Sequence, residues 1–160
     1  IKGIAALAGA QVSYVKPHGA INNWACENVD VANAIAQAVK KSCPEMAMLA
    51  VSGTLLETAS RNAGLKTYSE VFADRGYSDD GNLVLRGQPG AMITDAGEAA
   101  DRLIQFFETG DMPTVSGGTV RLDADSICIH GDSAHAVDMA VQLRAALVAH
   151  GFTLRSFADV

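Results

Sequence analysis

The chain has 160 residues, of which 49% are hydrophobic and 19% are charged, a composition typical of a folded domain and not of a disordered segment. Its 18 acidic and 12 basic side chains leave a formal net charge of -6, which argues against nonspecific binding to nucleic acid. Gly, Ser or a charged residue interrupts every apolar stretch well short of the ~20 residues that a membrane-spanning helix requires.

Short apolar runs alternate with amphipathic segments along the chain, and this alternation is typical of β/α units. We predict one strand that ends at Tyr14-Val15-Lys16, three more over residues 46–51, 69–73 and 126–129, and a short last one around 153–155. The 126–129 run is almost continuously apolar, as expected for a strand that is covered on both faces.

Apolar residues at helical spacing predict four helices, over residues 31–39, 55–63, 100–107 and 136–147. Polar residues are expected to cap three of them, and Gly64 is expected to end the second. The caps are Asp30 for the first, Asp95 with Glu98 as a capping box for the third, and Ser133 for the last. Asp80-Gly81 and Gly117-Gly118 predict two hairpin turns.

Side chains that can carry out chemistry directly follow four of the predicted strands. They are Lys16 and His18, then Ser52, then Asp74 and Arg75, then His130 and Asp132. The carboxyl ends of parallel strands meet at one edge of a sheet, where such folds build their sites, so we predict a site there. Each residue also has a simpler interpretation: a histidine that bonds its loop, an aspartate at a helix start, or a surface ion pair.

Two classes of ligand site can be compared with this pattern. His18, Asp74, His130 and Asp132 are nitrogen and oxygen donors that a divalent ion could use, but their spacing matches no known metal motif. The glycine-rich phosphate loop GxxxxGK[ST] is absent, and no GxGxxG follows a strand. Metal use stays open, and the chain is not expected to hold ATP by a phosphate loop.

Four motifs occur in a fixed order along the chain. They are Val15-Lys16-Pro17-His18-Gly19-Ala20, Glu70-Val71-Phe72-Ala73-Asp74-Arg75, Gln88-Pro89-Gly90-Ala91 and Ile127-Cys128-Ile129-His130-Gly131-Asp132. Together they resemble the family of 5-oxoprolinase A subunits, also called the lactam-utilisation LamB/YcsF family. The amino-terminal motifs of that family, an Asn-Ala-Asp segment and a loop with Gly-Phe-His, have no counterpart in the chain, so the resemblance is to the carboxyl-terminal part of a member.

The resemblance implies an α/β fold of the TIM-like (β/α) barrel type. Residues 1–160 would form a single domain, an amino-terminally truncated barrel that contains the later strands and helices. Such a segment leaves a sheet edge open, and we expect it to be poorly soluble or inactive on its own. The implied activity is the cytoplasmic, ATP-dependent hydrolysis of the 5-oxoproline lactam to L-glutamate. ATP would be a co-substrate, and the enzyme would be assembled with 5-oxoprolinase subunits B and C.

The strand-end grouping and the motif match together give a hypothesis for the site. Asp74, His130 and Asp132 would serve as acid and base. Lys16, His18, Arg75 and Arg86 would hold the substrate carboxylate or a phosphate. Two alternatives stay open: a metal-dependent amide or deacetylase-type hydrolase on a related barrel, and a non-catalytic protein that only scaffolds its partners.

Overall fold

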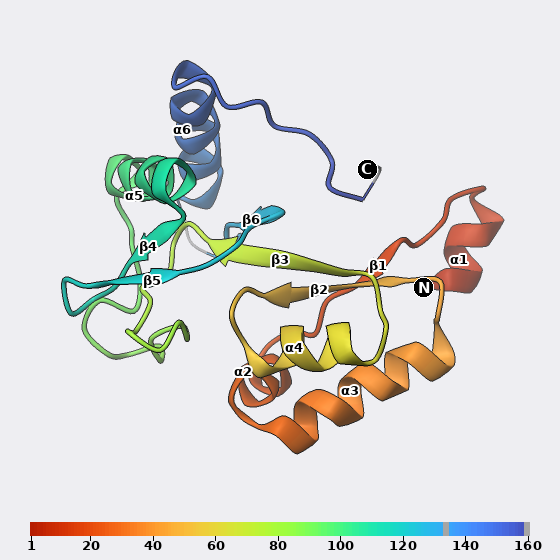
Figure 1. Cartoon of the computed structure of the whole chain (residues 1–160). Helices are drawn as coiled ribbons and strands as arrows, with labels where there is room; N and C mark the ends of the chain where they lie inside the picture. The colour runs from red at the N-terminus through yellow and green to blue at the C-terminus, as the bar shows by residue number, and fades with distance from the viewer. Residues whose placement is uncertain (133–134, 159–160) are drawn as a thin grey trace. The chain divides into compact units, whose positions relative to one another are not determined.

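A computed structural model describes residues 1–132 and 135–158 of the chain (Figure 1). The chain divides into two compact units: unit 1 contains Ile1–Ser69 and the carboxyl-terminal residues from Phe157, and unit 2 contains Glu70–Ser156. Both units combine helices with parallel strands, which confirms the predicted α/β class. None of the helices in the described ranges is both long and apolar enough to cross a membrane.

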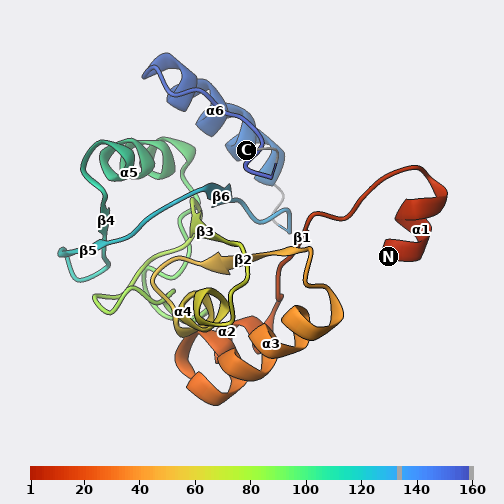
Figure 2. The same ribbon diagram turned by 45° about the vertical axis from the view of Figure 1, so that its right-hand side comes forward.

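Unit 1 packs helices on a parallel strand pair, β1 (Tyr14–Val15) and β2 (Ala47–Val51), in which Tyr14 lies opposite Ala47. All five residues of β2 are buried, as expected for a covered parallel strand. The other elements are α1 (Lys2–Leu7), α2 (Ala20–Glu27), α3 (Val29–Ser42), α4 (Leu55–Asn62) and the first half of β3 (Thr67–Phe72). Figures 1 and 2 both show α2, α3 and α4 on one side of β2.

The ends of α3 and α4 show which sequence signals set the helix boundaries. Asn28 caps α3, because its Oδ1 accepts the N–H of Asp30 at 3.0 Å and that of Val31 at 3.1 Å. The prediction of Asp30 as the cap was wrong: the helix begins earlier, and Asp30 lies in its first turn, where a carboxylate favours the helix dipole. Gly64 follows α4 with a φ of +70°, which confirms its predicted role at the end of that helix.

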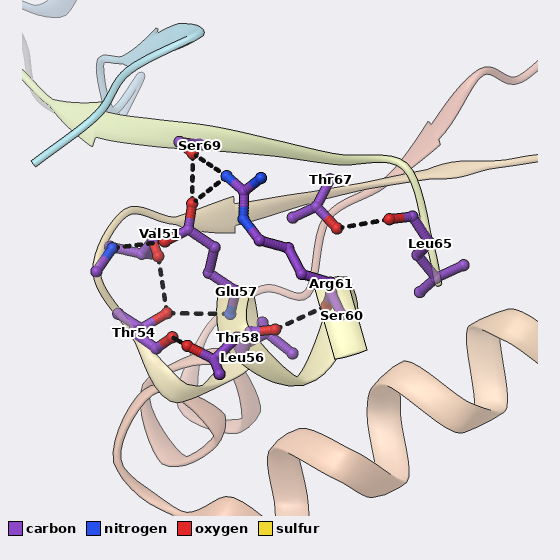
Figure 3. A network of polar contacts seen from close by, with 11 residues as sticks. Val51, Thr54, Leu56, Glu57, Thr58, Ser60, Arg61, Leu65, Thr67 and Ser69 are labelled. Carbon is purple, nitrogen blue, oxygen red and sulfur yellow. Dashed lines mark hydrogen bonds and ion pairs between the residues drawn. The ribbon is translucent and has the colours of Figure 1, made fainter. Parts of the chain in front are cut away.

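A buried polar network joins α4 to β3 in unit 1 (Figure 3). The Glu57 side chain is at its centre: Oε2 accepts the Gly53 N–H at 2.8 Å, and Oε1 accepts from the Ser69 hydroxyl and, at 2.9 Å, from the Arg61 guanidinium. Arg61 also donates to Ser69 Oγ at 3.0 Å. Thr54 caps α4 by accepting the Glu57 N–H. The carboxylate therefore holds together the turn after β2, the helix and the strand.

Unit 2 contains a second parallel pair, formed by the last residues of β3 and by β6 (Ser126–Cys128), with Phe72 opposite Cys128. An antiparallel pair, β4 (Asp111–Pro113) and β5 (Thr119–Arg121), lies next to it in the chain. The helices α5 (Ala96–Thr109) and α6 (Ala136–Ala149) pack against each other (Figure 2). The buried side chains of this unit come from β3, β4, α5, α6 and the connecting loops, and include Val71, Tyr77, Leu103, Phe106, Met112, Leu122 and Leu143.

Most predicted boundaries of unit 2 are confirmed, and one strand is not. Asp95 Oδ1 accepts the Glu98 N–H at 2.8 Å and caps α5 as expected. The turn at Gly117 joins β4 to β5. The strand expected at 153–155 was wrong: these residues are exposed and have no strand conformation, because a three-residue run without a paired neighbour cannot satisfy its backbone groups as a strand. The predicted cap Ser133 lies outside the described residues.

Gly76 lies where two segments of unit 2 cross, and we expect its replacement by alanine to destabilise the fold. A Cβ atom there would be 2.1 Å from Gly90 O and 2.9 Å from Val115 Cγ1, so the backbone itself would have to move. We expect Gly76→Ala to lower the free energy of unfolding by about 3 kcal/mol, measured by urea denaturation. Gly131→Ala is the control, because within the described ranges no atom beyond its two chain neighbours lies within 4 Å of the added Cβ. Equal stability of the two variants would contradict the prediction.

Candidate active site

The strand register of unit 2 brings Asp74 and His130 together. Phe72 and Cys128 lie opposite each other in the parallel pair, and each site residue follows its strand by the same two positions. Asp74 Oδ2 accepts the backbone N–H of His130 at 2.9 Å. His130 Nδ1 lies 3.0 Å from Asp74 Oδ1 and 2.9 Å from Oδ2. The predicted meeting of these two side chains at the strand ends is therefore observed.

This contact determines which ring nitrogen of His130 is basic. An ionised carboxylate can only accept hydrogen bonds, so Nδ1 carries the proton in the neutral ring and Nε2 has a free lone pair. The Asp74 side chain is 6% exposed and that of His130 is 19% exposed. Phe72 stacks on the imidazole with ring centroids 5.4 Å apart and an interplanar angle of 27°. The ring is thus held at one edge and on one face, and an oriented base with this geometry can accept a proton through Nε2.

Arg86 forms an ion pair with Asp132, which follows His130 of the Asp74–His130 dyad by two residues, and Arg86 NH1 lies 3.3 Å from Asp132 Oδ2. Both side chains are more than half exposed, so the pair adds little to stability. The hydrogen bond from Arg86 is the main reason why the pKa of Asp132 lies below its usual value. The Asp132 carboxylate therefore keeps its negative charge to a lower pH than an ordinary aspartate, at a position two residues after His130.

Replacing Arg86 by glutamine is expected to raise the pKa of Asp132 towards the ordinary value of an aspartate. Because the pKa of Asp132 is lowered, the Arg86–Asp132 pair is fully formed at a pH above the ordinary aspartate pKa. It is lost as the pH falls through the lowered pKa of Asp132. A carbon-13 NMR titration of the Asp132 carboxyl measures the change. Arg121→Gln is the control, because Arg121 pairs with Asp111 at 3.5 Å and not with Asp132. A downward shift in Arg86→Gln would contradict the prediction.

Arg75 lies inside unit 2, where its guanidinium bonds the backbone. Nε donates to Ala91 O at 3.0 Å, and NH2 donates to Val84 O at 2.6 Å. Burial, and then the charge of Arg86, lower the pKa of Arg75 below its usual value. These contacts hold the 84–91 segment next to the residue that follows Asp74. The role of Arg75 in binding a substrate anion stays a prediction.

Lys16 and His18 belong to unit 1, in the segment between β1 and α2. Lys16 is half-buried and His18 is exposed. The structure brings Asp74 to His130 and Arg86 to Asp132 within unit 2, whereas the inclusion of Lys16 and His18 in the same site stays a prediction. Among residues 1–132 and 135–158, no three His, Cys, Asp or Glu side chains gather in an arrangement that could hold a metal ion.

Two side chains near the dyad were not predicted from the sequence. Tyr77, which is fully buried, accepts the Phe72 N–H on its hydroxyl at 2.9 Å, and burial raises its pKa well above the usual value. Arg102, on α5, donates to Arg75 O at 2.8 Å. The sequence offered one signal for Arg102, a positive charge next to the apolar positions of a predicted helix. It offered none for Tyr77, which follows the motif residues without a distinctive pattern.

Comparison with known proteins supports the resemblance seen in the sequence. The model of the LamB/YcsF family matches residues 1–160. A protein of Paracidovorax citrulli, named as the A subunit of 5-oxoprolinase, is 43% identical over 158 residues, covering 99% of this chain and 63% of that protein. A protein of the same name from Shouchella clausii is 44% identical over 153 residues, covering 96% of this chain and 60% of that protein.

A solved structure shows the same arrangement of the backbone. The crystal structure of the lactam utilization protein from Thermus thermophilus matches with a TM-score of 0.85 and 37% identity, over 96% of this chain and 61% of that one. The chain thus spans about three fifths of the length of the proteins it matches. The family match over residues 1–160, the sequence identity to the relatives and the similarity of the backbone all agree. The chain belongs to the LamB/YcsF family.

Proposed function

We propose that the chain carries the water-activating base of a 5-oxoprolinase, an enzyme that hydrolyses the 5-oxoproline lactam to L-glutamate with ATP as co-substrate. The observation that supports this most is the Asp74–His130 pair, in which a buried carboxylate orients a partly exposed imidazole. The 5-oxoprolinase name shared by the curated relatives supports the substrate. The name lactam utilization protein supports the same bond type.

The chemistry needs both ATP and a base because an unstrained lactam is stabilised by amide resonance. Transfer of the terminal phosphoryl group to the lactam oxygen releases ADP and makes the ring carbonyl carbon electrophilic. Water adds to that carbon while His130 Nε2 takes its proton, and the C–N bond then breaks as the imidazolium returns this proton to the departing amine, which leaves His130 neutral again. A second water hydrolyses the resulting acyl phosphate to glutamate and phosphate. Asp74 stabilises the imidazolium that forms in each addition.

The charged side chains near the dyad suit the anionic substrate. Arg86 is more than half exposed and its guanidinium can bind a carboxylate or a phosphate in a bidentate manner. We propose that the substrate anion replaces Asp132 as the partner of Arg86, and that Asp132 then takes part in proton transfer. Lys16 and His18 are proposed to complete the anion site, and Arg75 to hold its loop in place. The relatives are named as A subunits, so subunits B and C are the proposed partners.

The test is an assay of 5-oxoproline-dependent ATP hydrolysis by the protein in complex with subunits B and C. We expect glutamate to appear with ADP, and His130→Ala and Asp132→Asn to lose this coupled turnover while the complex still assembles. Full turnover in both variants would favour a scaffold without catalytic residues. Glutamate formation without ATP, abolished by a chelator, would instead favour a metal-dependent amide hydrolase.

A further inference from the structure

The backbone that carries Asp74 is held on the side that faces away from β6. The Ala73 N–H donates to Cys128 O at 3.0 Å, across the strand pair. Successive N–H groups of a strand point in opposite directions, so the Phe72 N–H points away from β6. The Tyr77 hydroxyl accepts it there at 2.9 Å. The tyrosine therefore holds the backbone at the strand end, two residues before Asp74.

A second contact fixes the backbone on the other side of Asp74. Arg102 NH1 donates to Arg75 O at 2.8 Å, and its guanidinium carbon lies 5.5 Å from the centroid of the Tyr77 ring. The Asp74 carbonyl itself accepts the Ile93 N–H at 3.0 Å. Residues 72 to 75 thus have bonded backbone groups on both sides of the aspartate, and these bonds fix where its Cα–Cβ bond points.

Tyr77 and Arg102 carry polar groups that are not needed to fill the space they occupy. A phenylalanine would fill the buried volume of Tyr77, but it could not accept the Phe72 N–H, which the hydroxyl does. A long apolar side chain could fill the position of Arg102, so only the Arg75 carbonyl, the tyrosine ring and a contact with Met112 Sδ at 3.1 Å use its guanidinium. Phe72, whose N–H is held, is also the residue that stacks on His130.

We propose that Tyr77 and Arg102 are positioning residues that hold residues 72–75 so that Asp74 keeps the His130 ring in the tautomer protonated at Nδ1. Neither side chain contacts the imidazole. Tyr77 acts through the backbone of Phe72, which precedes Asp74, and Arg102 acts through the carbonyl that follows it. This role deepens the proposed function, and its kinetic part rests on that function; its structural part does not.

The test measures which ring nitrogen of His130 is protonated, by proton and nitrogen-15 NMR of the protein in complex with subunits B and C. We expect a downfield Nδ1–H signal, identified by its absence in His130→Gln. In Tyr77→Phe this signal is expected to weaken, and the ring nitrogen shifts are expected to move towards a mixture of tautomers. In the coupled assay, kcat is expected to fall about tenfold or more while KM changes less than about twofold, because a displaced base affects the chemical step and not ground-state binding.

The controls separate positioning from general loss of structure. Tyr68→Phe also removes a tyrosine hydroxyl, but from a ring in unit 1 that packs against Phe157, and it should leave the signal and kcat unchanged. Arg102→Met removes the second contact and is expected to change the signal and kcat in the same directions. If urea denaturation shows that Tyr77→Phe is unfolded, the Arg102→Met variant tests the positioning role in its place.

Three results would overturn the proposal: an unchanged Nδ1–H signal in the folded variants, an unchanged kcat in both, or an equal change in Tyr68→Phe. Absence of lactam-dependent turnover in the unmodified complex would instead contradict the proposed function. The NMR comparison would still decide whether Tyr77 and Arg102 position the ring.

Discussion

Replacement of Asp74 by asparagine is expected to lower kcat of the proposed 5-oxoproline-dependent ATP hydrolysis by about a thousandfold. The backbone N–H of His130 donates to Asp74 Oδ2, and the amide oxygen of an asparagine would keep that bond. The amide NH2 would then face Nδ1 and donate to it, so that Nδ1 becomes the acceptor and Nε2 carries the proton. A ring with a protonated Nε2 cannot take a proton from water, even though its position is unchanged.

Kinetics of three further variants check this explanation. His130→Ala should be at least as slow as Asp74→Asn, and the double variant should be no slower than His130→Ala, because the two residues act as one unit. Asp95→Asn is the matched control, since asparagine also serves as a helix cap and Asp95 caps α5. Retention of more than about a tenth of the normal kcat in Asp74→Asn would contradict the tautomer argument.

Replacement of Glu57 by alanine is expected to lower the free energy of unfolding by about 3 kcal/mol. The loss leaves the Gly53 N–H and the Ser69 hydroxyl without their carboxylate acceptor (Figure 3). Ser69 is 1% exposed, so water does not replace the lost acceptor there. A negative charge also disappears from the first turn of α4, where it favours the helix dipole. Urea denaturation followed by circular dichroism measures the change.

Arg61→Ala is the comparison that identifies the source of this loss. The Arg61 side chain is 53% exposed, so its removal breaks a half-solvated ion pair and is expected to cost less than about 1 kcal/mol. Glu57→Gln should lie between the two, since an amide oxygen can still accept one of the buried donors. If Glu57→Ala were no less stable than Arg61→Ala, the carboxylate would not be the centre of the network.

The prediction that Asp74 and His130 lie together is confirmed, because it depended on local periodicity and on the parallel pairing of two strands. The apolar runs at 69–73 and 126–129 identified the strands, and the polar residues that follow them had to lie at the same edge if the strands were parallel. Tyr77 and Arg102 reach the same place through a loop and a helix that are distant in sequence from β6. The sequence pattern of a single helix or strand does not predict such contacts, so only the structure could identify them.

The helices α1 and α2 were missed for a related reason. In α2 the buried residues are Asn22 and Ala25, whereas Ile21 is 53% exposed and Trp24 is 61% exposed. The large apolar residues therefore do not mark the buried face, and a search for a stripe of them does not find this helix. In α1 no residue is buried at all. The network at Glu57 was equally hidden, because its members look like ordinary surface residues of a helix.

The spacing from Phe72 to Asp74 equals the spacing from Cys128 to His130, and this equality limits which insertions and deletions can be accepted during evolution. A residue inserted between strand and side chain on one strand only would move one partner along the edge and turn it to the opposite direction. Point substitutions in β3 or β6 can be accommodated by repacking, but a single insertion or deletion in either segment cannot. Members that keep the pair are therefore expected to vary in length elsewhere, in the hairpins and in the segments before the helices, and to keep these two intervals unchanged.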